Sequence, residues 1–267
     1  MNFEKYKIIM NIQYNILRGT AFDSKVSLDG CDIYKSSVVA DSFCNFVIIN
    51  NEDIFDKKSA LANIEQNFAE INRKPCIYIP RLINKHAEYK SYLINNCYKI
   101  NDTDVCMTLV APINNIETPK TINIIRVSNN EQYNDFMEVL ESAYGGEISI
   151  DNPYAGSITD EYHEAIRLSL GNDKFKHFVL YKDNRPASVA TLSYYDSYGI
   201  ISNVGTKKEF QNHGLGKQII KHCVDKFNDV DGKSIFLITE LDSKNERWYQ
   251  KLGFEPIFVN EQYIKNI

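Results

Sequence analysis

The chain has 267 residues, of which 43% are hydrophobic and 24% charged, and its formal net charge is −5. These values suit a globular protein of one large or two modest domains, and they lack the basic surplus of a nucleic-acid-binding protein. No apolar run approaches the roughly 20 residues that cross a membrane, and the N-terminus resembles no secretory signal. We therefore expect a cytoplasmic protein whose partners include neither nucleic acid nor membrane.

The six cysteines are scattered along the chain without a Cys-x-x-Cys pair. Zinc sites and disulfide frameworks usually show such paired spacings. We expect no metal site, and we interpret the cysteines as free, buried thiols.

A polar stretch at 111–120, APINNIETPK, divides the chain. It holds two prolines and no apolar periodicity, which is typical of a linker. Only Gly19 and Gly30 of the twelve glycines precede it, so a site that needs a glycine-shaped backbone should follow it. We expect one domain over 1–118 and a second over 119–267.

Strands and helices alternate in the first part. Short apolar runs predict strands at 46–50, 76–80 and 105–110, and apolar residues at helical spacing predict helices at 59–72 and 85–95. Such alternation is typical of an α/β layer domain.

The second part repeats this alternation over a longer stretch. Asp183-Asn184 separates two alternating runs and predicts a hairpin turn. The expected elements, in order, are a strand at 122–127, helices at 131–143 and 162–170, the hairpin at 177–195, a strand at 200–206, a long helix, a strand at 234–240, a short helix and a strand at 255–259.

The most informative segment lies between the strand at 200–206 and the long helix. It reads Gln211-Asn212-His213-Gly214-Leu215-Gly216. Glycines at a strand-to-helix turn let backbone N–H groups converge on an anion, and the helix N-terminus adds roughly half a positive charge there. The segment matches neither a Walker loop nor a full dinucleotide fingerprint. It predicts a site for a phosphate or pyrophosphate group.

This segment resembles the central motif of the GCN5-related N-acetyltransferases, Arg/Gln-x-x-Gly-x-Gly/Ala after a strand. Gln211, Gly214 and Gly216 fall on that signature. The stretch ELDSKNERWYQKLGFEPIFV resembles the closing element of the same family, in which Tyr249 and Gly253-Phe254 fit. The resemblance covers about residues 120–267.

The resemblance implies a cofactor, acetyl-CoA, as co-substrate. The family binds the pantetheine arm along a splayed strand and the pyrophosphate on the glycine loop, and Tyr249 matches its proton donor to the leaving thiolate. The positions that would contact the cofactor are Val204, Gly205, Thr206, Gln211, Asn212, His213, Gly214, Leu215, Gly216, Lys217 and Asn245.

The sequence departs from the family pattern at two points. Asn245 stands four residues before Tyr249 rather than about seven, where Asp242 stands. The splayed strand offers no glutamate as general base, so Glu240, at the end of the neighbouring strand, is the candidate base. We interpret His163 and His177 as surface or core residues.

The end of the first part echoes the closing element of the second, with Cys97-Tyr98 where Gly253-Phe254 stands. It resembles a degenerate copy of the acetyltransferase fold without the glycine loop, which could shape the acceptor pocket together with residues 144–154. The expected fold class is α/β, with a mixed sheet flanked by helices in each part.

The expected function is transfer of an acetyl group to a primary amine of a small molecule by direct attack in a ternary complex. A protein or peptide acceptor is an alternative, and a non-catalytic acyl-CoA sensor is another. The amine acceptor and a homodimer are left open by the sequence, as is the acyl-chain length. Fold alone does not decide among these functions.

Overall fold

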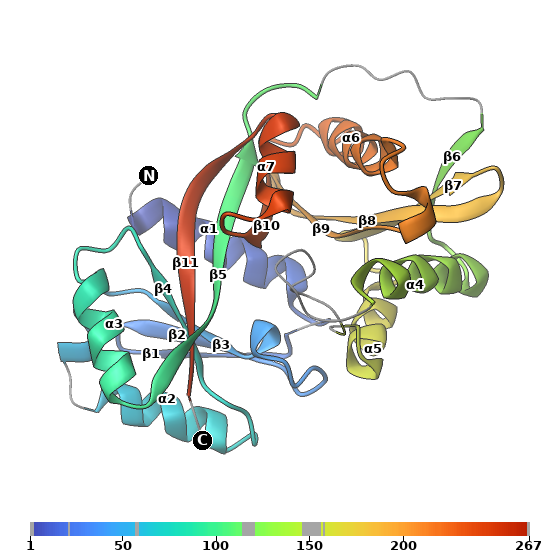
Figure 1. Cartoon of the computed structure of the whole chain (residues 1–267). Helices are drawn as coiled ribbons and strands as arrows, with labels where there is room; N and C mark the ends of the chain where they lie inside the picture. The colour runs from blue at the N-terminus through green and yellow to red at the C-terminus, as the bar shows by residue number, and fades with distance from the viewer. Residues whose placement is uncertain are drawn as a thin grey trace. The chain divides into compact units, whose positions relative to one another are not determined.

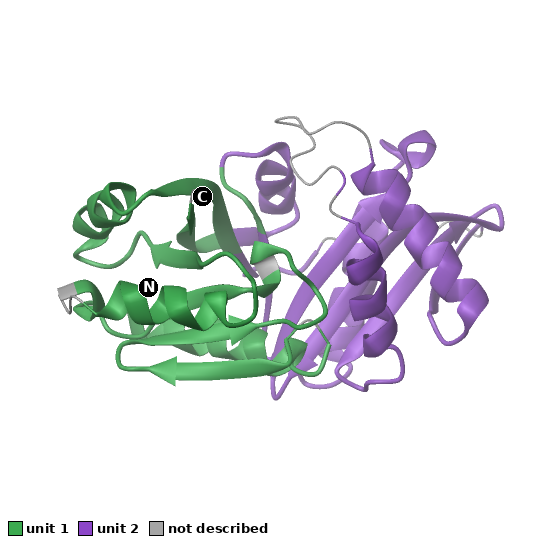
Figure 2. Ribbon diagram, turned by 90° about the horizontal axis from the view of Figure 1, so that it is seen from below, with its two compact units in different colours: residues 1–106, 239–241, 256–267 green, residues 107–238, 242–255 purple. Residues whose placement is uncertain are grey.

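The computed structural model describes residues 3–20, 22–56, 59–113, 121–145, 156 and 158–265. Contacts divide the chain into two compact units (Figure 2). Unit 1 comprises residues 1–106, 239–241 and 256–267, and unit 2 comprises residues 107–238 and 242–255. Most of the expected linker lies outside the described residues, and the expected domain boundary between residues 118 and 119 stays a prediction.

Unit 1 contains a mixed sheet in the strand order β1-β2-β3-β4-β11. Strands β3 and β4 are parallel, and the other neighbours are antiparallel. The elements that begin in unit 1 are α1 (Phe3–Leu17), β1 (Ser24–Leu28), β2 (Cys31–Lys35), η1 (Ser42–Cys44), β3 (Phe46–Ile49), η2 (Ile54–Asp56), α2 (Ala60–Ala69), β4 (Cys76–Pro80), α3 (His86–Asn95) and β5 (Tyr98–Leu109).

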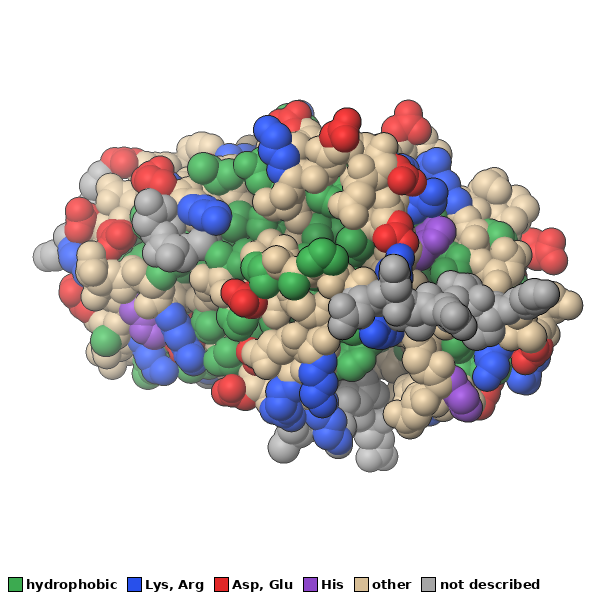
Figure 3. All heavy atoms as spheres, turned by 90° about the horizontal axis from the view of Figure 1, so that it is seen from above, with side chains coloured by type: hydrophobic (Ala, Val, Ile, Leu, Met, Phe, Trp, Pro, Cys, Tyr) green, Lys and Arg blue, Asp and Glu red, His purple; other side chains and the backbone are tan. Residues whose placement is uncertain are grey.

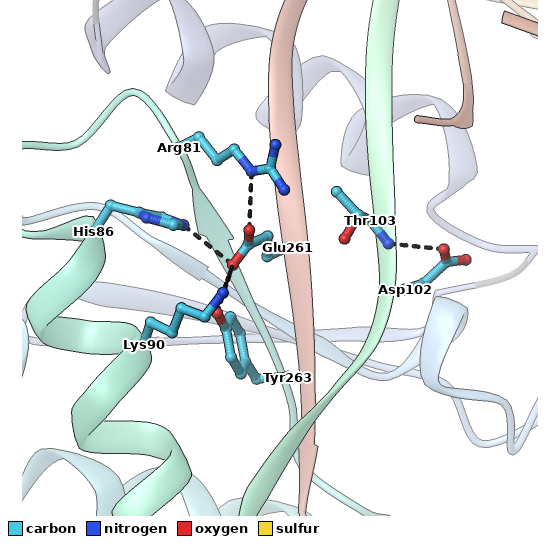
Figure 4. Close-up of polar contacts among 7 residues, drawn as sticks. All are labelled: Arg81, His86, Lys90, Asp102, Thr103, Glu261 and Tyr263. Atoms are coloured by element: carbon cyan, nitrogen blue, oxygen red, sulfur yellow. Dashed lines mark hydrogen bonds and ion pairs between the residues drawn. The ribbon is translucent and has the colours of Figure 1, made fainter. Parts of the chain in front are cut away.

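The last strand of the chain, β11 (Phe254–Lys265), runs into unit 1 and pairs with β4 from Asn260↔Pro80 to Ile264↔Cys76. Its buried Glu261 accepts hydrogen bonds from Arg81 Nε at 2.9 Å and Tyr263 Oη at 2.5 Å, and His86 Nε2 lies 3.2 Å away (Figure 4). Burial alone would raise the pKa of Glu261, but the hydrogen bonds of Tyr263 and Arg81 lower it below its usual value. The carboxylate is therefore held ionised among groups that unit 1 supplies.

Unit 2 contains a mixed run of hydrogen-bonded strands in the order β10-β9-β8-β7-β6. Only β9 and β10 are parallel neighbours in it. Its elements are β6 (Ile122–Arg126), α4 (Asn130–Tyr144), α5 (Asp160–Ser169), β7 (Phe175–Lys182), β8 (Arg185–Tyr195), β9 (Tyr198–Thr206), η3 (Lys208–Phe210), α6 (Leu215–Asn228), β10 (Ser234–Glu240) and α7 (Lys244–Lys251).

Helices cover both faces of the unit 2 sheet, with α6 on one face and α4 and α5 on the other (Figure 1). Strand β9 contains a β-bulge. Val189 pairs with Gly205 and Thr191 with Ser202, so Asn203 and Val204 stand opposite one residue of β8. The extra residue reverses the alternation of side chains along β9. Accordingly, a Cβ on Gly199 would contact Phe227 of α6 at 2.8 Å, whereas a Cβ on Gly205 would contact Ala143 of α4 at 2.9 Å.

The observed elements agree with the expected α/β class and its mixed sheets. Asp183 and Asn184 both have positive φ, as a two-residue hairpin turn of this kind requires. Helix α1 and the β1–β2 hairpin were not expected from the sequence, and strands β5 and β11 are longer than expected. No helix among the described residues is long and apolar enough to cross a membrane.

The ends of the two halves share a local arrangement. Cys97, with φ of 66°, joins α3 to β5, and Gly253, with φ of 98°, joins α7 to β11. Each helix therefore ends on a residue in the left-handed region, where glycine is usual. The predicted correspondence of Cys97-Tyr98 with Gly253-Phe254 is seen in both backbone and position. The described cysteines are free thiols, and all but Cys97 are buried.

Candidate active site

Strands β9 and β10 separate soon after they begin. They pair only from Tyr198↔Ser234 to Ile200↔Phe236, although β9 continues to Thr206 and β10 to Glu240. Beyond Ile200 the edge of β9 that faces away from β8 therefore has no strand partner in β10. Such an edge presents backbone N–H and C=O groups to an extended ligand.

A loop with two left-handed residues follows β9. Asn212 has φ of 63° and Gly214 has φ of 75°, and α6 begins at the next residue. The first backbone bond of the helix runs from the Gln218 N–H to the Gly214 carbonyl at 3.2 Å. Among the described residues, the amides of 212–217 therefore find no backbone acceptor, and they are a ready site for an anion.

The two loop glycines serve different purposes. A Cβ on Gly214 would meet nothing within 4 Å, so this position needs glycine for its positive φ. A Cβ on Gly216 would lie 3.3 Å from the Trp248 ring and 3.6 Å from Thr206 Oγ1, so this position needs glycine for close approach. The unpaired amides and the bare Gly214 fit a phosphate group, as acetyl-CoA would supply.

The side chains of this region differ in what they can offer. Lys207 is buried and forms an ion pair with Glu138 at 2.5 Å, whereas Lys217, in the first turn of α6, is half-buried. Gln211 and His213 are exposed, and Gln211 donates its side-chain N–H to the Thr206 carbonyl at 3.2 Å. Lys217 is thus the better placed countercharge for an anion on the helix N-terminus.

Tyr249 lies on α7, which Ser243 caps by accepting a hydrogen bond from Glu246 N. The Tyr249 ring is 8% exposed and packs against Trp248 and Phe254, with ring centroids 4.9 Å and 5.8 Å away. Burial, followed by the neighbouring Tyr144 and Cys223, raises the pKa of Tyr249 well above its usual value. Its phenol therefore keeps its proton at neutral pH, as a general acid must.

Glu240 and Asn245 are two further predicted site residues. Glu240 belongs to unit 1, where burial and then the charge of Asp102 raise its pKa. Asn245 is exposed on the first turn of α7. The structure therefore groups the loop, the β9 edge and Tyr249 within unit 2, and it describes Glu240 with the other unit.

Sequence reasoning missed the polar side chains that surround the β9 bulge. Tyr144 Oη donates to the Val204 carbonyl at 3.2 Å, and Tyr162 Oη donates to Asn203 Oδ1 at 2.5 Å. The expected acceptor-pocket segment at 144–154 lies outside the described residues except for its first two positions. Only the bulge reveals these contacts, and a bulge has no sequence signal as clear as a glycine loop.

Charged side chains of both signs are interspersed over the face drawn in Figure 3. Among the described residues, no group of three or more histidine, cysteine or acidic side chains could hold a metal ion.

Comparison with solved structures shows the same fold over the whole chain. A GCN5-related N-acetyltransferase from Kribbella flavida superposes with a TM-score of 0.72 at 16% identity, covering 100% of this chain and 97% of its own. A conserved protein of unknown function from Staphylococcus epidermidis gives 0.71 at 14% identity, covering 97% and 100%. A tandem GNAT protein from the clavulanic acid biosynthesis pathway gives 0.61 at 10% identity, covering 88% and 77%.

No curated protein sequence matches the chain. Residues 134–254, however, match the model of the acetyltransferase (GNAT) family. That span contains the β9 bulge, the glycine loop and Tyr249. The chain therefore carries an acetyltransferase domain of the GNAT family, a family of acetyl-CoA-dependent acyltransferases, over residues 134–254.

Proposed function

We propose that the chain is an N-acetyltransferase that moves the acetyl group of acetyl-CoA to a primary amine of a small molecule. The observation that carries the proposal is the run of amides at 212–217 without a backbone acceptor, at the end of a β9 edge that has left β10. A pyrophosphate and an extended pantetheine arm need these two features in this order. Acetyl-CoA would supply an acetyl group activated as a thioester.

The residues of the chain would divide the work as follows. The amides of 212–217 and Lys217 would hold the phosphates, with Gln211 bracing the loop through the Thr206 carbonyl. The backbone of Val204–Thr206 would hold the pantetheine arm. Asn245 is a further proposed contact, from the exposed start of α7.

An amine must lose a proton to attack, and the departing sulfur gains from receiving one. Glu240 is the proposed base, since its raised pKa makes it a better proton acceptor than an exposed carboxylate. Tyr249 Oη is the proposed donor, because Tyr249 stands where the family resemblance places the proton donor and its phenol is protonated at neutral pH. Direct attack in a ternary complex needs no covalent enzyme intermediate.

The test is release of free thiol from acetyl-CoA in the presence of a panel of primary amines. Gly214→Glu places a side chain and a negative charge among the loop amides, and we expect it to abolish turnover. Gly171→Glu is the matched control: Gly171 also has positive φ (80°) and open space around its Cα, but it follows α5. Equal loss of turnover in both variants would contradict the assignment of the loop.

Tyr249→Phe tests the proton donor in the same assay. We expect kcat to fall roughly 10²- to 10⁴-fold with little change in KM for acetyl-CoA, because the phenol acts only as the bond to sulfur breaks. An unchanged kcat would remove Tyr249 from the mechanism. Acetyl-CoA binding without turnover on any small amine or peptide would instead favour a sensor, and turnover on peptides alone would favour a protein acceptor.

A further inference from the structure

A line of hydrogen-bonded side chains crosses the unit 2 sheet beneath α4 and α5 and ends on the β9 bulge. Its members, in order, are Ser169, His177, Thr191, Asn203 and Tyr162. The first three members are nearly inaccessible to solvent: Ser169 is 2% exposed, His177 3% and Thr191 1%. We name this set the His177 chain.

The direction of each hydrogen bond in the His177 chain follows from its inner end. Ser169 Oγ lies 2.6 Å from the Ile166 carbonyl, which can only accept, so the Ser169 hydroxyl donates there. Ser169 Oγ must then accept at 2.7 Å from His177 Nε2–H. A neutral imidazole with its proton on Nε2 leaves Nδ1 as an acceptor, which fixes the tautomer of His177.

The outer end follows in turn. Thr191 donates its hydroxyl to His177 Nδ1 at 2.8 Å, so its oxygen accepts from the Asn203 side-chain N–H at 3.0 Å. Asn203 Oδ1 is then left to accept from the Tyr162 hydroxyl at 2.5 Å. Each donor in the His177 chain has one acceptor, and the direction of each hydrogen bond determines the direction of the next.

The imidazole is in the state that this order requires. Burial, and next the positive charge of Arg126, lower the pKa of His177 to about 4. The ring is also packed between aromatic side chains, with Phe136 edge-on at 5.2 Å and Phe175 stacked at 6.1 Å. The histidine is therefore neutral and immobile at physiological pH.

The outer end of the His177 chain lies at the β9 bulge, next to the proposed binding site of the pantetheine arm. Asn203 has φ of 53° and forms the bulge with Val204, on the part of β9 that has separated from β10. The Val204 carbonyl is held at the same time by Tyr144. Tyr144 of α4 therefore holds the main chain of this stretch directly, and Tyr162 of α5 and Thr191 of β8 hold the Asn203 side chain next to it. On the β10 side no pairing with β10 holds the same stretch.

We propose that the His177 chain is a positioning device that holds the main chain of Asn203–Val204 at the acetyl end of acetyl-CoA. The inference rests on the proposed function and adds Thr191, His177 and Asn203 to it as positioning residues. None of the three is itself a catalytic residue. A bulge that drifts by about 1 Å would misplace the backbone groups facing the thioester, which can cost on the order of 10² in rate.

The test compares Thr191→Val with Thr191→Ser. Valine keeps the shape of threonine and removes the hydroxyl that joins His177 to Asn203, whereas serine keeps the hydroxyl. We expect Thr191→Val to lower kcat roughly 10- to 100-fold and Thr191→Ser to stay within about threefold of the wild type.

Two further variants separate positioning from loss of stability. Asn203→Gly keeps the left-handed backbone without strain and removes the same link, so it should match Thr191→Val, and the double variant should lose no more than either alone. Val139→Ala removes bulk from the same core, at a fully buried position of α4 that does not belong to the His177 chain. If Val139→Ala lowers kcat as much at equal loss of melting temperature, the inference is wrong.

A readout without turnover distinguishes this inference from the proposed function. If the wild type acetylates no amine, the proposed function fails, and the His177 chain is judged by the ratio of Kd for CoA to Kd for acetyl-CoA, measured calorimetrically. The inference predicts that this ratio falls towards 1 in Thr191→Val and is kept in Thr191→Ser. An unchanged ratio in Thr191→Val would overturn it.

Discussion

Two buried ionisable residues, one in each unit, have pKa values shifted by burial in the direction that favours their neutral forms. Burial, and next the charge of Arg126, lower the pKa of His177 in unit 2 to about 4. Burial, and next Asp102, raise the pKa of Asp104 in unit 1 to about 7, although a hydrogen bond from Gln262 opposes the shift. Both residues are neutral over part of the range in which the unfolded chain would be charged, so both link stability to pH.

The two shifts act in opposite directions. Unfolded His177 binds a proton below about pH 6.5 and the folded residue only below about 4, so acidification through this window favours unfolding by up to roughly 3 kcal/mol. Unfolded Asp104 releases its proton near pH 4 and the folded residue near 7, so raising the pH through this window favours unfolding by a similar amount. The stability of the protein should therefore depend less on pH than either the His177 or the Asp104 contribution alone.

Neutral replacements isolate each contribution. We expect His177→Gln, which keeps a donor and an acceptor, to remove the His177 contribution, so that the variant gains stability relative to the wild type as the pH falls from 6.5 to 4.5. Asp104→Asn should be more stable than the wild type at pH 7.5 and nearly equal to it at pH 4.5. Urea unfolding at each pH, expressed as variant minus wild type, measures both; a difference that does not change with pH would contradict the assigned cause.

Residue-scale prediction from sequence succeeded where one residue type has one physical use. The pattern Gln211-x-x-Gly214-x-Gly216 predicted a loop of free amides because glycine readily adopts the positive φ that Gly214 has. The His177 chain was not predicted, because Ser169, Thr191 and Asn203 are common residues whose roles depend on three strands and a helix meeting. Glu240 was chosen as base by elimination, and sequence could not show that it packs with unit 1.

At the scale of elements, α7 shows how a short helix is held in place to present one side chain. Ser243 accepts from Glu246 N at 3.0 Å, and Glu246 accepts from Asp242 N, one residue before the N-cap, at 2.6 Å, which is close to the reciprocal arrangement of a capping box. The helix has only eight residues, too few to be stable by itself. Its cap and the packing of Tyr249 therefore stabilise it together.

Removing the cap should loosen the helix. We expect Ser243→Ala to lower the free energy of unfolding by about 1 kcal/mol, and Ser243→Thr, which keeps the hydroxyl, to lower it by much less. If α7 places Tyr249 for proton donation, kcat should fall in the alanine variant as well. Thermal unfolding and the thiol-release assay measure the two effects, and an alanine variant as stable as the threonine variant would show that the cap contributes little.

Most elements were predicted because their apolar spacing is regular, and those that were missed fail for identifiable reasons. Helix α1 does bury Tyr6, Ile9 and Ile16 on one side, but its asparagines weaken the helical signal. The β1–β2 hairpin turns at Asp29-Gly30, a recognised signal that the sequence analysis did not use. Strand β11 was predicted to end near residue 259 because its next residues are polar, and their partners come from distant parts of the chain.

At the scale of the whole molecule, the two units are interleaved along the sequence. The contact division places residues 256–267 in unit 1, so the end of the chain completes the sheet that its beginning starts. Tyr263 is fully buried in the core of unit 1 together with Ile77 and Ile79 of β4. Periodicity and motifs, which are read locally, gave no indication of this exchange.

The interleaving makes a prediction about fragments. A fragment of residues 1–118 lacks β11, so β4 loses its antiparallel partner, the core loses the Tyr263 ring, and Arg81 and His86 lose the buried Glu261 carboxylate. We expect this fragment to be unfolded or aggregated, because an open apolar strand edge and an incomplete core both favour self-association. Circular dichroism should then show no cooperative thermal transition.

A second fragment serves as the control. Residues 1–118 joined through a flexible glycine-serine linker to residues 254–267 restore the β4–β11 pairs, and we expect this chain to melt cooperatively. In that chain Glu261→Leu should lower the melting temperature, because the substitution leaves Arg81 and His86 without their buried acceptor. If residues 1–118 fold cooperatively without β11, the N-terminal part is an independent domain, and the last strand is an addition to a core that is already complete.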